Sequence, residues 1–208
     1  MGKDKKSRGK ILALIISCVL ILDQVSKIWI KTHFTLSQSV NVLGSWFQLC
    51  FVENEGMAFG MMLGGNGGKL ILSIFRVVLS IFIMWYICRL LKKPETPMGA
   101  LIGLSLVFVG AVGNIIDSAF YGLIFSESGL TQVAALFPPE GGYAPFLHGK
   151  VVDMLYFPLI DTVLPDSFPF LGGKRFIFFR FIFNVADSAI TCGAIYLLLF
   201  QYKFFTKK

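Results

Sequence analysis

Long apolar runs separated by shorter polar stretches dominate the pattern along this chain of 208 residues. Four of the runs approach the roughly 20 residues that a helix needs to cross a bilayer. We expect transmembrane helices over about 11–30, 70–91, 98–120 and 181–201. The pattern predicts a single all-α membrane domain over residues 1–208, a bundle of four transmembrane helices. Two larger regions, 31–69 and 121–180, then lie outside the bilayer.

The two regions between the spans have different compositions. Residues 40–52 combine β-branched and aromatic side chains around Gly44-Ser45, which predicts a small extracytoplasmic β-hairpin or sheet. The second region is rich in phenylalanine near its end, at Phe168, Phe170, Phe176, Phe178, Phe179, Phe181 and Phe183. Such an aromatic segment suits the outer face of the membrane at the lipid interface. A packed extracytoplasmic subdomain explains the same aromatic residues equally well.

Composition and charge support a membrane protein. Apolar residues make up 55% of the chain and charged residues 15%, below the roughly 25% of soluble proteins. The net charge is +7, and 11 of the 19 Lys and Arg residues flank apolar runs: Lys3, Lys5, Lys6, Arg8, Lys10, Arg89, Lys92, Lys93, Lys203, Lys207 and Lys208. This distribution follows the positive-inside rule and places both termini and the 92–97 turn in the cytoplasm. It does not form a nucleic-acid-binding stripe.

Polar and ionisable residues occur within the predicted spans, where they are energetically costly. Asp23 and Lys27 in the first span are four residues apart and can pair on one helix face. One face of the third span carries small residues first and polar residues further along: Gly110, Gly113, Asn114 and Asp117. Asn184 and Asp187 are three residues apart in the fourth span. For each of these polar residues taken alone, the ordinary explanation is structural: a hydrogen bond or ion pair that holds two helices together.

The depths of three carboxylates favour a functional site over glue. At 1.5 Å per residue, Asp23 lies about 20 Å from Lys10, and Asp187 lies about 24 Å from Lys203. Asp117 is about 28 Å from the start of its span, so all three carboxylates fall near the outer boundary of the bilayer.

Aspartate chemistry suits such a site. The two histidines of the chain lie outside the spans and no HExxH motif occurs, which argues against a zinc peptidase. Two aspartates that share a proton can activate water and polarise a peptide carbonyl without a metal or cofactor. We therefore expect an aspartyl peptidase within the membrane.

Five motifs of the chain resemble those of the lipoprotein signal peptidases, the signal peptidase II family, in the family order. They are Asp23-Gln24-Val25-Ser26-Lys27, Glu53-Asn54-Glu55-Gly56-Met57-Ala58-Phe59, Gly110-Ala111-Val112-Gly113-Asn114-Ile115-Ile116-Asp117, His148-Gly149-Lys150-Val151-Val152-Asp153 and Phe183-Asn184-Val185-Ala186-Asp187. The resemblance implies that Asp153 and Asp187 are the catalytic pair and that Asp117 supports them. It implies that the site is lined by Asn54, Gly110, Asn114 and Asn184, and that Asp23 and Lys27 position the substrate or hold the structure.

The resemblance also implies an activity and a location. The expected activity is removal of signal peptides from diacylglyceryl-modified prolipoproteins, by cleavage before the lipidated cysteine. The expected location is the cytoplasmic (inner) membrane of a bacterium, with both termini in the cytoplasm. Prolipoproteins and membrane lipids are the expected partners, a monomer is the expected state, and neither cofactor, metal nor nucleic acid is expected.

The chain departs from the family pattern at several positions. Ser118 stands where the family usually has arginine, and Met154 stands where phenylalanine is usual. We expect another cation to replace the arginine, first Arg76, and otherwise Arg175 or Arg180. Residues 122–147 and 158–180 also lengthen links that are usually short.

Two other functions compete with a peptidase. Membrane aspartates can form the proton relay of a transporter, although the carboxylates here share one depth instead of crossing the membrane. A non-catalytic assembly factor could use them as interhelical glue. Depth alone would also rank Asp153 below Asp117, because Asp153 lies outside the third span.

Overall fold

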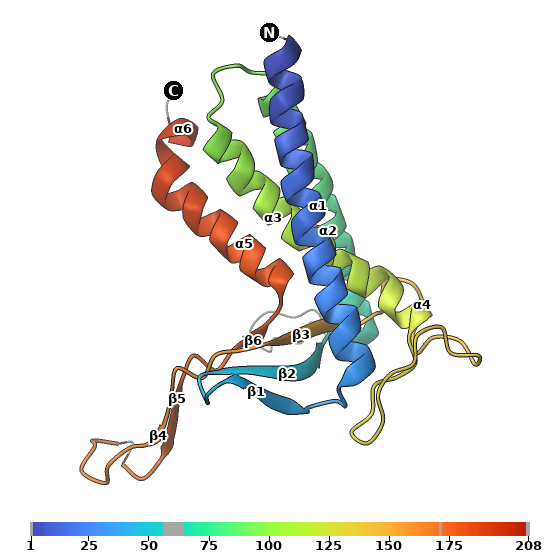
Figure 1. Cartoon of the computed structure of the whole chain (residues 1–208), viewed down its shortest axis with the longest axis vertical. Coiled ribbons are helices and arrows are strands. Elements are labelled where there is room, and N and C mark those ends of the chain that lie inside the picture. Colours follow the sequence, from blue (N-terminus) through green and yellow to red (C-terminus); the bar gives the residue numbers. More distant parts are fainter. Residues whose placement is uncertain (1, 56–64, 171, 207–208) are drawn as a thin grey trace.

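Four long helical stretches run side by side in the computed structural model, which describes residues 2–55, 65–170 and 172–206. Each is long and apolar enough to cross a membrane: Lys6–His33, Gly68–Leu91, Met98–Ile124 and Val185–Thr206. They correspond to α1 (Gly2–His33), α2 (Gly65–Leu91), α3 (Met98–Ile116) with its extension, and α5 (Val185–Tyr196) with its extension. Both termini lie at the same end of this bundle (Figure 1). The four predicted membrane helices are therefore present.

All four helices differ from their predicted bounds at one end or both, and the differences in α3 and α5 lie beside the polar residues. α3 continues through a wider π-helical turn, η1 (Asp117–Tyr121), into α4 (Gly122–Ile124), beyond the predicted end at residue 120. α5 begins at Val185 instead of 181, because Asn184 and Asp187 form a reciprocal capping box at its N-terminus. At its other end α5 passes through η2 (Leu197–Gln201) into α6 (Tyr202–Thr206).

A four-stranded antiparallel sheet lies across the end of the bundle opposite the termini (Figure 1). Its strands are β1 (Ser39–Leu43), β2 (Phe47–Asn54), β3 (Val151–Tyr156) and β6 (Ile182–Phe183), in the order β1-β2-β3-β6. The hairpin predicted over 40–52 is the β1-β2 pair, with Gly44 at a positive φ of 54° in its turn. Residues 56–59 of the second sequence motif lie outside the described residues.

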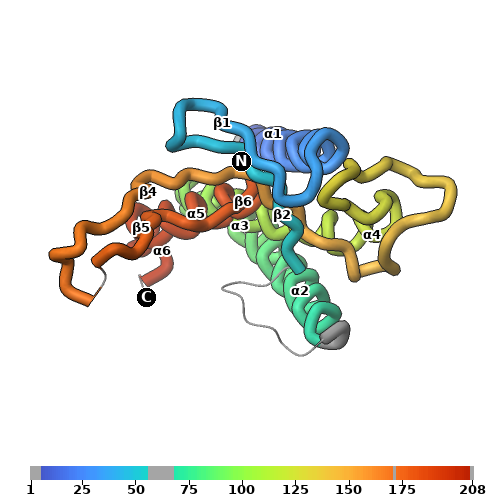
Figure 2. The backbone as a smooth tube through the Cα atoms, turned by 90° about the horizontal axis from the view of Figure 1, so that it is seen from below, coloured from blue at the N-terminus to red at the C-terminus, as the bar shows by residue number. Residues whose placement is uncertain are grey.

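A second hairpin projects from the sheet as an arm. It consists of β4 (Ile160–Val163) and β5 (Arg175–Phe178), and it extends on the side of the molecule opposite α4 (Figures 1 and 2). We call residues 158–181 the β4-β5 arm. Its large apolar side chains are exposed, and Phe170 reaches 98%. Six of the seven phenylalanines of this region are exposed, whereas Phe183 in β6 is half-buried and stacks on Phe157. Contact with lipid and a packed subdomain both stay predictions for them.

Two apolar cores hold the fold together. The core at the sheet end joins α1, the strands and the π-helical turn, and it contains Ile30, Phe34, Phe51, Tyr121, Phe125, Ala134, Val152 and Met154. A smaller core near the termini contains Leu12, Ile87, Leu90 and Leu101. Between the cores α3 packs closely on α5, because Gly110 lies against the backbone carbonyl of Ala186 and has no room for a Cβ. This close approach carries the polar faces of both helices to one level.

Candidate active site

A buried lysine on α1 links polar residues of α1 and of the α3 stretch. Lys27 Nζ lies 2.9 Å from Asp23 Oδ2 and 2.8 Å from Asp117 Oδ2, and these side chains are at most 1% exposed. It also donates a hydrogen bond to Asn114 Oδ1 at 2.9 Å. The predicted pairing of Asp23 with Lys27 is therefore present, and the same ammonium group binds two residues of the α3 stretch. Burial of these charges requires such complete pairing.

Asp23 and Asp117 each tie a further element to this lysine. Asp23 Oδ1 accepts a hydrogen bond from the Ala186 backbone N–H at 2.8 Å, at the start of α5, where a carboxylate is favourable. Asp117 Oδ2 accepts from the Val152 backbone N–H at 3.3 Å and so holds strand β3. Gln24 Nε2 donates to both carboxylates, at 3.0 Å each. The lysine and its two aspartates thus fix β3 and α5 relative to one another.

Asp153 lies in β3, next to Val152, and is 4% exposed. Asn184 Nδ2 donates to its Oδ1 at 2.7 Å, and Asn54 Nδ2 donates to its Oδ2 at 3.2 Å. Burial first, and then the nearby charge of Asp187, raise the pKa of Asp153, whereas the two amide hydrogen bonds and the charge of Lys27 oppose the rise, and the resulting pKa is about 7. The carboxyl group of Asp153 can therefore hold a proton near neutral pH.

Asp187 lies in the first turn of α5 and faces the same group of residues. Asn114 Nδ2 donates to Asp187 Oδ1 at 2.8 Å. The Asp187 backbone N–H donates to Asn184 Oδ1 at 2.8 Å. Asn184 therefore contacts both aspartates, Asp153 through its amide nitrogen and the backbone of Asp187 through its amide oxygen. The charge of Asp187 also acts directly on the carboxyl group of Asp153.

The three cations proposed to replace the missing arginine lie in different places. Arg76 on α2 interacts electrostatically with both Asp187 and Asp153. Arg175 is 67% exposed on the β4-β5 arm and pairs with Asp161 instead, and Arg180 is exposed on the same arm. The geometry favours Arg76 as the cation of the site.

All nine residues that the sequence singled out lie in this one set of contacts: Asp23, Lys27, Asn54, Gly110, Asn114, Asp117, Asp153, Asn184 and Asp187. Their roles stay predictions. The bridge made by Gln24 was not predicted, although it directly follows Asp23 in the first motif.

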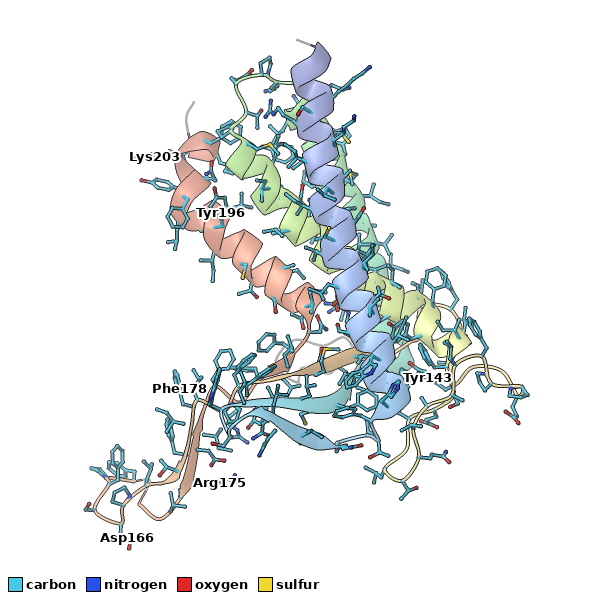
Figure 3. All side chains as sticks on the ribbon, viewed as in Figure 1. Tyr143, Asp166, Arg175, Phe178, Tyr196 and Lys203 are labelled. Carbon is cyan, nitrogen blue, oxygen red and sulfur yellow. The ribbon has the colours of Figure 1, made fainter. Side chains whose placement is uncertain are left out.

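A second buried charge cluster adjoins the first and was missed by sequence reasoning. Lys31, one helical turn beyond Lys27, is fully buried, forms an ion pair with Glu53 and lies 2.7 Å from Ser128 Oγ. Its Nζ also lies 5.0–5.9 Å from the ring centroids of three aromatic residues: Phe51, Phe125 and Tyr143. Figure 3 shows Tyr143 near the sheet end of α1. The i,i+4 spacing of Lys27 and Lys31 was the available signal.

Residues 125–149, which we call the 125–149 segment, bind this cluster from outside. Ser128 Oγ donates to Glu53 Oε1 at 2.8 Å, and Lys150 Nζ lies 3.5 Å from Glu53 Oε2. The Lys150 backbone N–H donates to Tyr143 Oη at 2.7 Å. Glu53 directly precedes Asn54, the amide that donates to Asp153. The 125–149 segment therefore supports the strand end that carries Asn54.

The chemistry of the cluster is that of carboxylates, amides and ammonium groups. Within the described ranges, no group of three or more His, Cys, Asp or Glu side chains is placed to hold a metal ion. A carboxyl with a raised pKa beside a second, amide-bound carboxylate can perform paired acid and base catalysis.

Comparisons with known proteins give one consistent result. A family model described as "Signal peptidase (SPase) II" matches residues 15–203. A lipoprotein signal peptidase of Porphyromonas gingivalis strain W83 is 51% identical over 192 residues, which cover 92% of this chain and 83% of the relative. One from Amoebophilus asiaticus is 36% identical over 183 residues, covering 86% and 72%. A bacterial membrane enzyme solved by the in meso method at 2.3 Å has the same fold, with a TM-score of 0.60, 23% identity, and coverage of 96% and 92%.

Proposed function

Because this chain belongs to the signal peptidase II family, we propose that it is an aspartyl endopeptidase that cuts prolipoproteins within the membrane. The family acts on prolipoproteins and removes their signal peptides, and the chain is a multi-pass bacterial membrane protease of that family. Family membership leaves no basis for the proton-coupled transporter or the non-catalytic assembly factor. The substrates proposed for this chain are prolipoproteins that carry a diacylglyceryl group, and cleavage falls before the lipidated cysteine.

The observation that carries the aspartyl mechanism is the contact of Asn184 with both Asp153 and Asp187. Asp153, protonated near neutral pH, donates a hydrogen bond to the scissile carbonyl oxygen. Asp187 accepts a proton from water as the water oxygen attacks the carbonyl carbon. Asp153 transfers its proton to the carbonyl oxygen in the same step, which gives a tetrahedral diol. The proton on Asp187 then passes to the leaving amine as the peptide C–N bond breaks, and a hydroxyl of the diol returns a proton to Asp153 as the carboxylic acid forms. No metal or cofactor takes part.

Supporting residues hold this pair in place. Asn114 orients Asp187, while Asn54 and Asn184 orient Asp153. Lys27 forms ion pairs with Asp23 and Asp117, and its charge also acts on Asp153. The charge of Arg76 reduces the repulsion between the two catalytic carboxyl groups.

We also propose an orientation. The sheet, the 125–149 segment and the β4-β5 arm face the outside of the cytoplasmic membrane, and both termini face the cytoplasm. The cationic end of the bundle supports this orientation, because Arg8 donates to the Thr96 backbone carbonyl at 2.5 Å, in the turn that also holds Lys92 and Lys93. The protein is proposed to act as a monomer, without nucleic acid.

The test uses purified protein and a diacylglyceryl-modified prolipoprotein, with the same prolipoprotein bearing an unmodified cysteine as the substrate control. The wild-type protein is expected to cleave only the lipidated substrate. Asp153→Asn and Asp187→Asn should each lower kcat by about 10²–10⁴-fold, the usual contribution of a general acid or base. Asp166→Asn, on the exposed β4-β5 arm, is the matched control and should retain activity. Cleavage that survives either site substitution would refute the aspartyl mechanism.

A further inference from the structure

An open groove of about 350 Å³ lies between α2 and α3, on the stretch of the bundle that crosses the bilayer. Apart from one serine its lining is apolar, and the residues are Val77, Ser80, Ile81, Met84, Phe108, Val112 and Ile115. A volume of this size is within the range of small-ligand sites. Because the groove opens toward the lipid, its natural occupant is a hydrocarbon chain.

Ser80 is the polar exception in this groove. Its side chain is buried, with a relative exposure of 5%, and its Oγ has no hydrogen-bond partner among the residues that the structure describes. A buried hydroxyl without a partner is costly, and native structures usually pair it. An occupant of the groove that carries a hydrogen-bond acceptor would satisfy this hydroxyl.

Two residues that line the groove directly follow residues of the candidate active site in the sequence. Val77 directly follows Arg76, which interacts with both Asp153 and Asp187. Ile115 directly follows Asn114, the amide that donates to Asp187. Ser80 is four residues beyond Arg76, about 6 Å further along α2, away from the sheet. Because residues four apart share a face of a helix, Ser80 lies on the same face of α2 as Arg76, the cation that interacts with the two aspartates.

We propose that the groove holds one acyl chain of the diacylglyceryl group on the substrate and that Ser80 donates a hydrogen bond to the ester carbonyl of that chain. This inference rests on the proposed function. In a diacylglyceryl-cysteine, the ester is separated from the scissile peptide by the cysteine side chain and the glycerol carbons. The ester therefore falls deeper in the bilayer than the scissile bond, as Ser80 lies deeper than Arg76.

The groove is expected to position the substrate lipid more than to strengthen its binding. Lipid tails are as apolar as the groove, so moving an acyl chain from bilayer to protein gains little hydrophobic energy. The hydroxyl of Ser80 supplies the directional contact, and it fixes how far the lipid enters. That depth sets which peptide bond meets Asp153 and Asp187. A phospholipid chain of the bilayer is the competing occupant, but its headgroup has no reason to lie at the two aspartates.

The first experiment compares a diester substrate with an analogue whose two chains are attached as ethers, which lack the carbonyl oxygen. Ser80→Ala should lower kcat/KM for the diester substrate about three- to tenfold, the range of one hydrogen bond, and leave the diether substrate unchanged. Ser105→Ala is the matched control, because Ser105 Oγ is also buried without a partner in the described part of the chain but does not line the groove. Equal effects of Ser80→Ala on both substrates would overturn the proposal.

The second experiment does not depend on turnover. A non-cleavable diacylglyceryl-cysteine peptide with a diazirine in one acyl chain is photocrosslinked to the protein in nanodiscs, and the products are mapped by mass spectrometry. Labelling is expected within 77–84 and 108–115, and excess unlabelled lipopeptide should remove it. Val112→Trp should reduce this labelling at least tenfold, whereas Leu79→Trp, a lipid-exposed position outside the groove, should not.

Labelling that only phospholipid can displace would assign the groove to bulk lipid and refute the inference. Specific labelling by a protein that fails to cleave lipidated substrate would refute the proposed function alone.

Discussion

The 125–149 segment and the β4-β5 arm are attached to opposite ends of strand β3. The first segment contributes side chains to a buried cluster, whereas the second leaves most of its side chains exposed. The 125–149 segment places Ser128 against a fully buried ion pair and surrounds Lys31 with aromatic rings. The β4-β5 arm leaves its Arg175–Asp161 ion pair and most of its phenylalanines exposed (Figure 3). Two segments of similar length can therefore contribute very differently, one as part of the framework of the candidate active site and the other as a surface.

The backbone register of the arm sharpens this contrast. Cross-strand partners share a face of the hairpin, so Ile160, Phe178, Thr162 and Phe176 lie on one side. Asp161 and Arg175 lie on the other side and bind each other through two hydrogen bonds of 2.7 Å and 2.5 Å. An isolated two-stranded hairpin is marginally stable in water. An apolar face on such a hairpin is consistent with the lipid contact that its phenylalanines predict.

The largest expected difference between the two segments concerns their ion pairs. Lys31→Met leaves Glu53 as a buried charge without its main partner, and it should lower the free energy of unfolding by about 3–5 kcal/mol. Arg175→Met removes one half of an exposed pair and should leave the unfolding midpoint unchanged within error. Thermal or SDS-induced unfolding in detergent micelles measures both variants. Equal losses would mean that the two pairs do not differ as their burial indicates.

The pH dependence of stability should separate the site from the arm. The pKa of Asp153 is raised to about 7, so the folded state holds a proton that the unfolded state releases near pH 4. This proton stabilises the fold at low pH, and the stabilisation is lost as the pH rises toward 7. From pH 5 to 7 the loss should reach about 2–3 kcal/mol.

Two substitutions test that assignment. Asp153→Asn removes the titrating group and should flatten the decline in stability between pH 5 and 7. Asp166→Asn, on the arm, should keep the wild-type slope. An unchanged slope in Asp153→Asn would assign the pH dependence to another group.

A smaller effect is expected from one hydroxyl of the 125–149 segment. Ser128→Ala removes the group that contacts both Lys31 and Glu53, and it should cost about 1–3 kcal/mol of stability, the penalty for buried polar partners left unpaired. Ser167→Ala, at an exposed position of the arm, is the control and should have no measurable effect. Unfolding of both variants under the same conditions gives the comparison. A neutral result for Ser128→Ala would show that the segment does not brace the cluster.

Spin labels on the two segments should have the smallest effect on stability. They also report directly whether the labelled position faces lipid or water. In a background without the four native cysteines, labels replacing Phe170 or Phe178 should leave the unfolding midpoint unchanged. Both labels should be accessible to a lipid-soluble quencher in nanodiscs. A label at Leu130, exposed in the 125–149 segment, should respond to a water-soluble quencher instead. Protection of the arm labels from both quenchers would exclude the lipid contact.

The sequence revealed the parts of the site that follow from local periodicity. Apolar runs located the helices, and the i,i+4 spacing correctly paired Asp23 with Lys27. The predicted start of the fourth helix, residue 181, was too early, because Phe181, Ile182 and Phe183 are as apolar as the helix that follows. The cap at Asn184, not a change in hydropathy, determines where that helix begins.

The remainder of the site depends on pairing between distant strands. Asp153 is brought to its amide partner Asn54 because β3 pairs with β2. The two residues are 99 positions apart in the sequence. No periodicity within either strand contains that register, so only the resemblance to the family singled out Asp153. The same reason hid Ser128, a polar residue in a loop whose importance comes from Lys31, 97 residues earlier.

The order in which the charges of this bundle enter the membrane follows from the position of Lys27. Asp23 and Lys27 lie on the same helix, so α1 brings a neutralised pair with it when it inserts. Asp117 emerges from the ribosome about ninety residues later, and chains are synthesised from the N-terminus. Its counter-charge is then already in the bilayer. The third helix can therefore pair Asp117 with Lys27 on a helix that was synthesised before it.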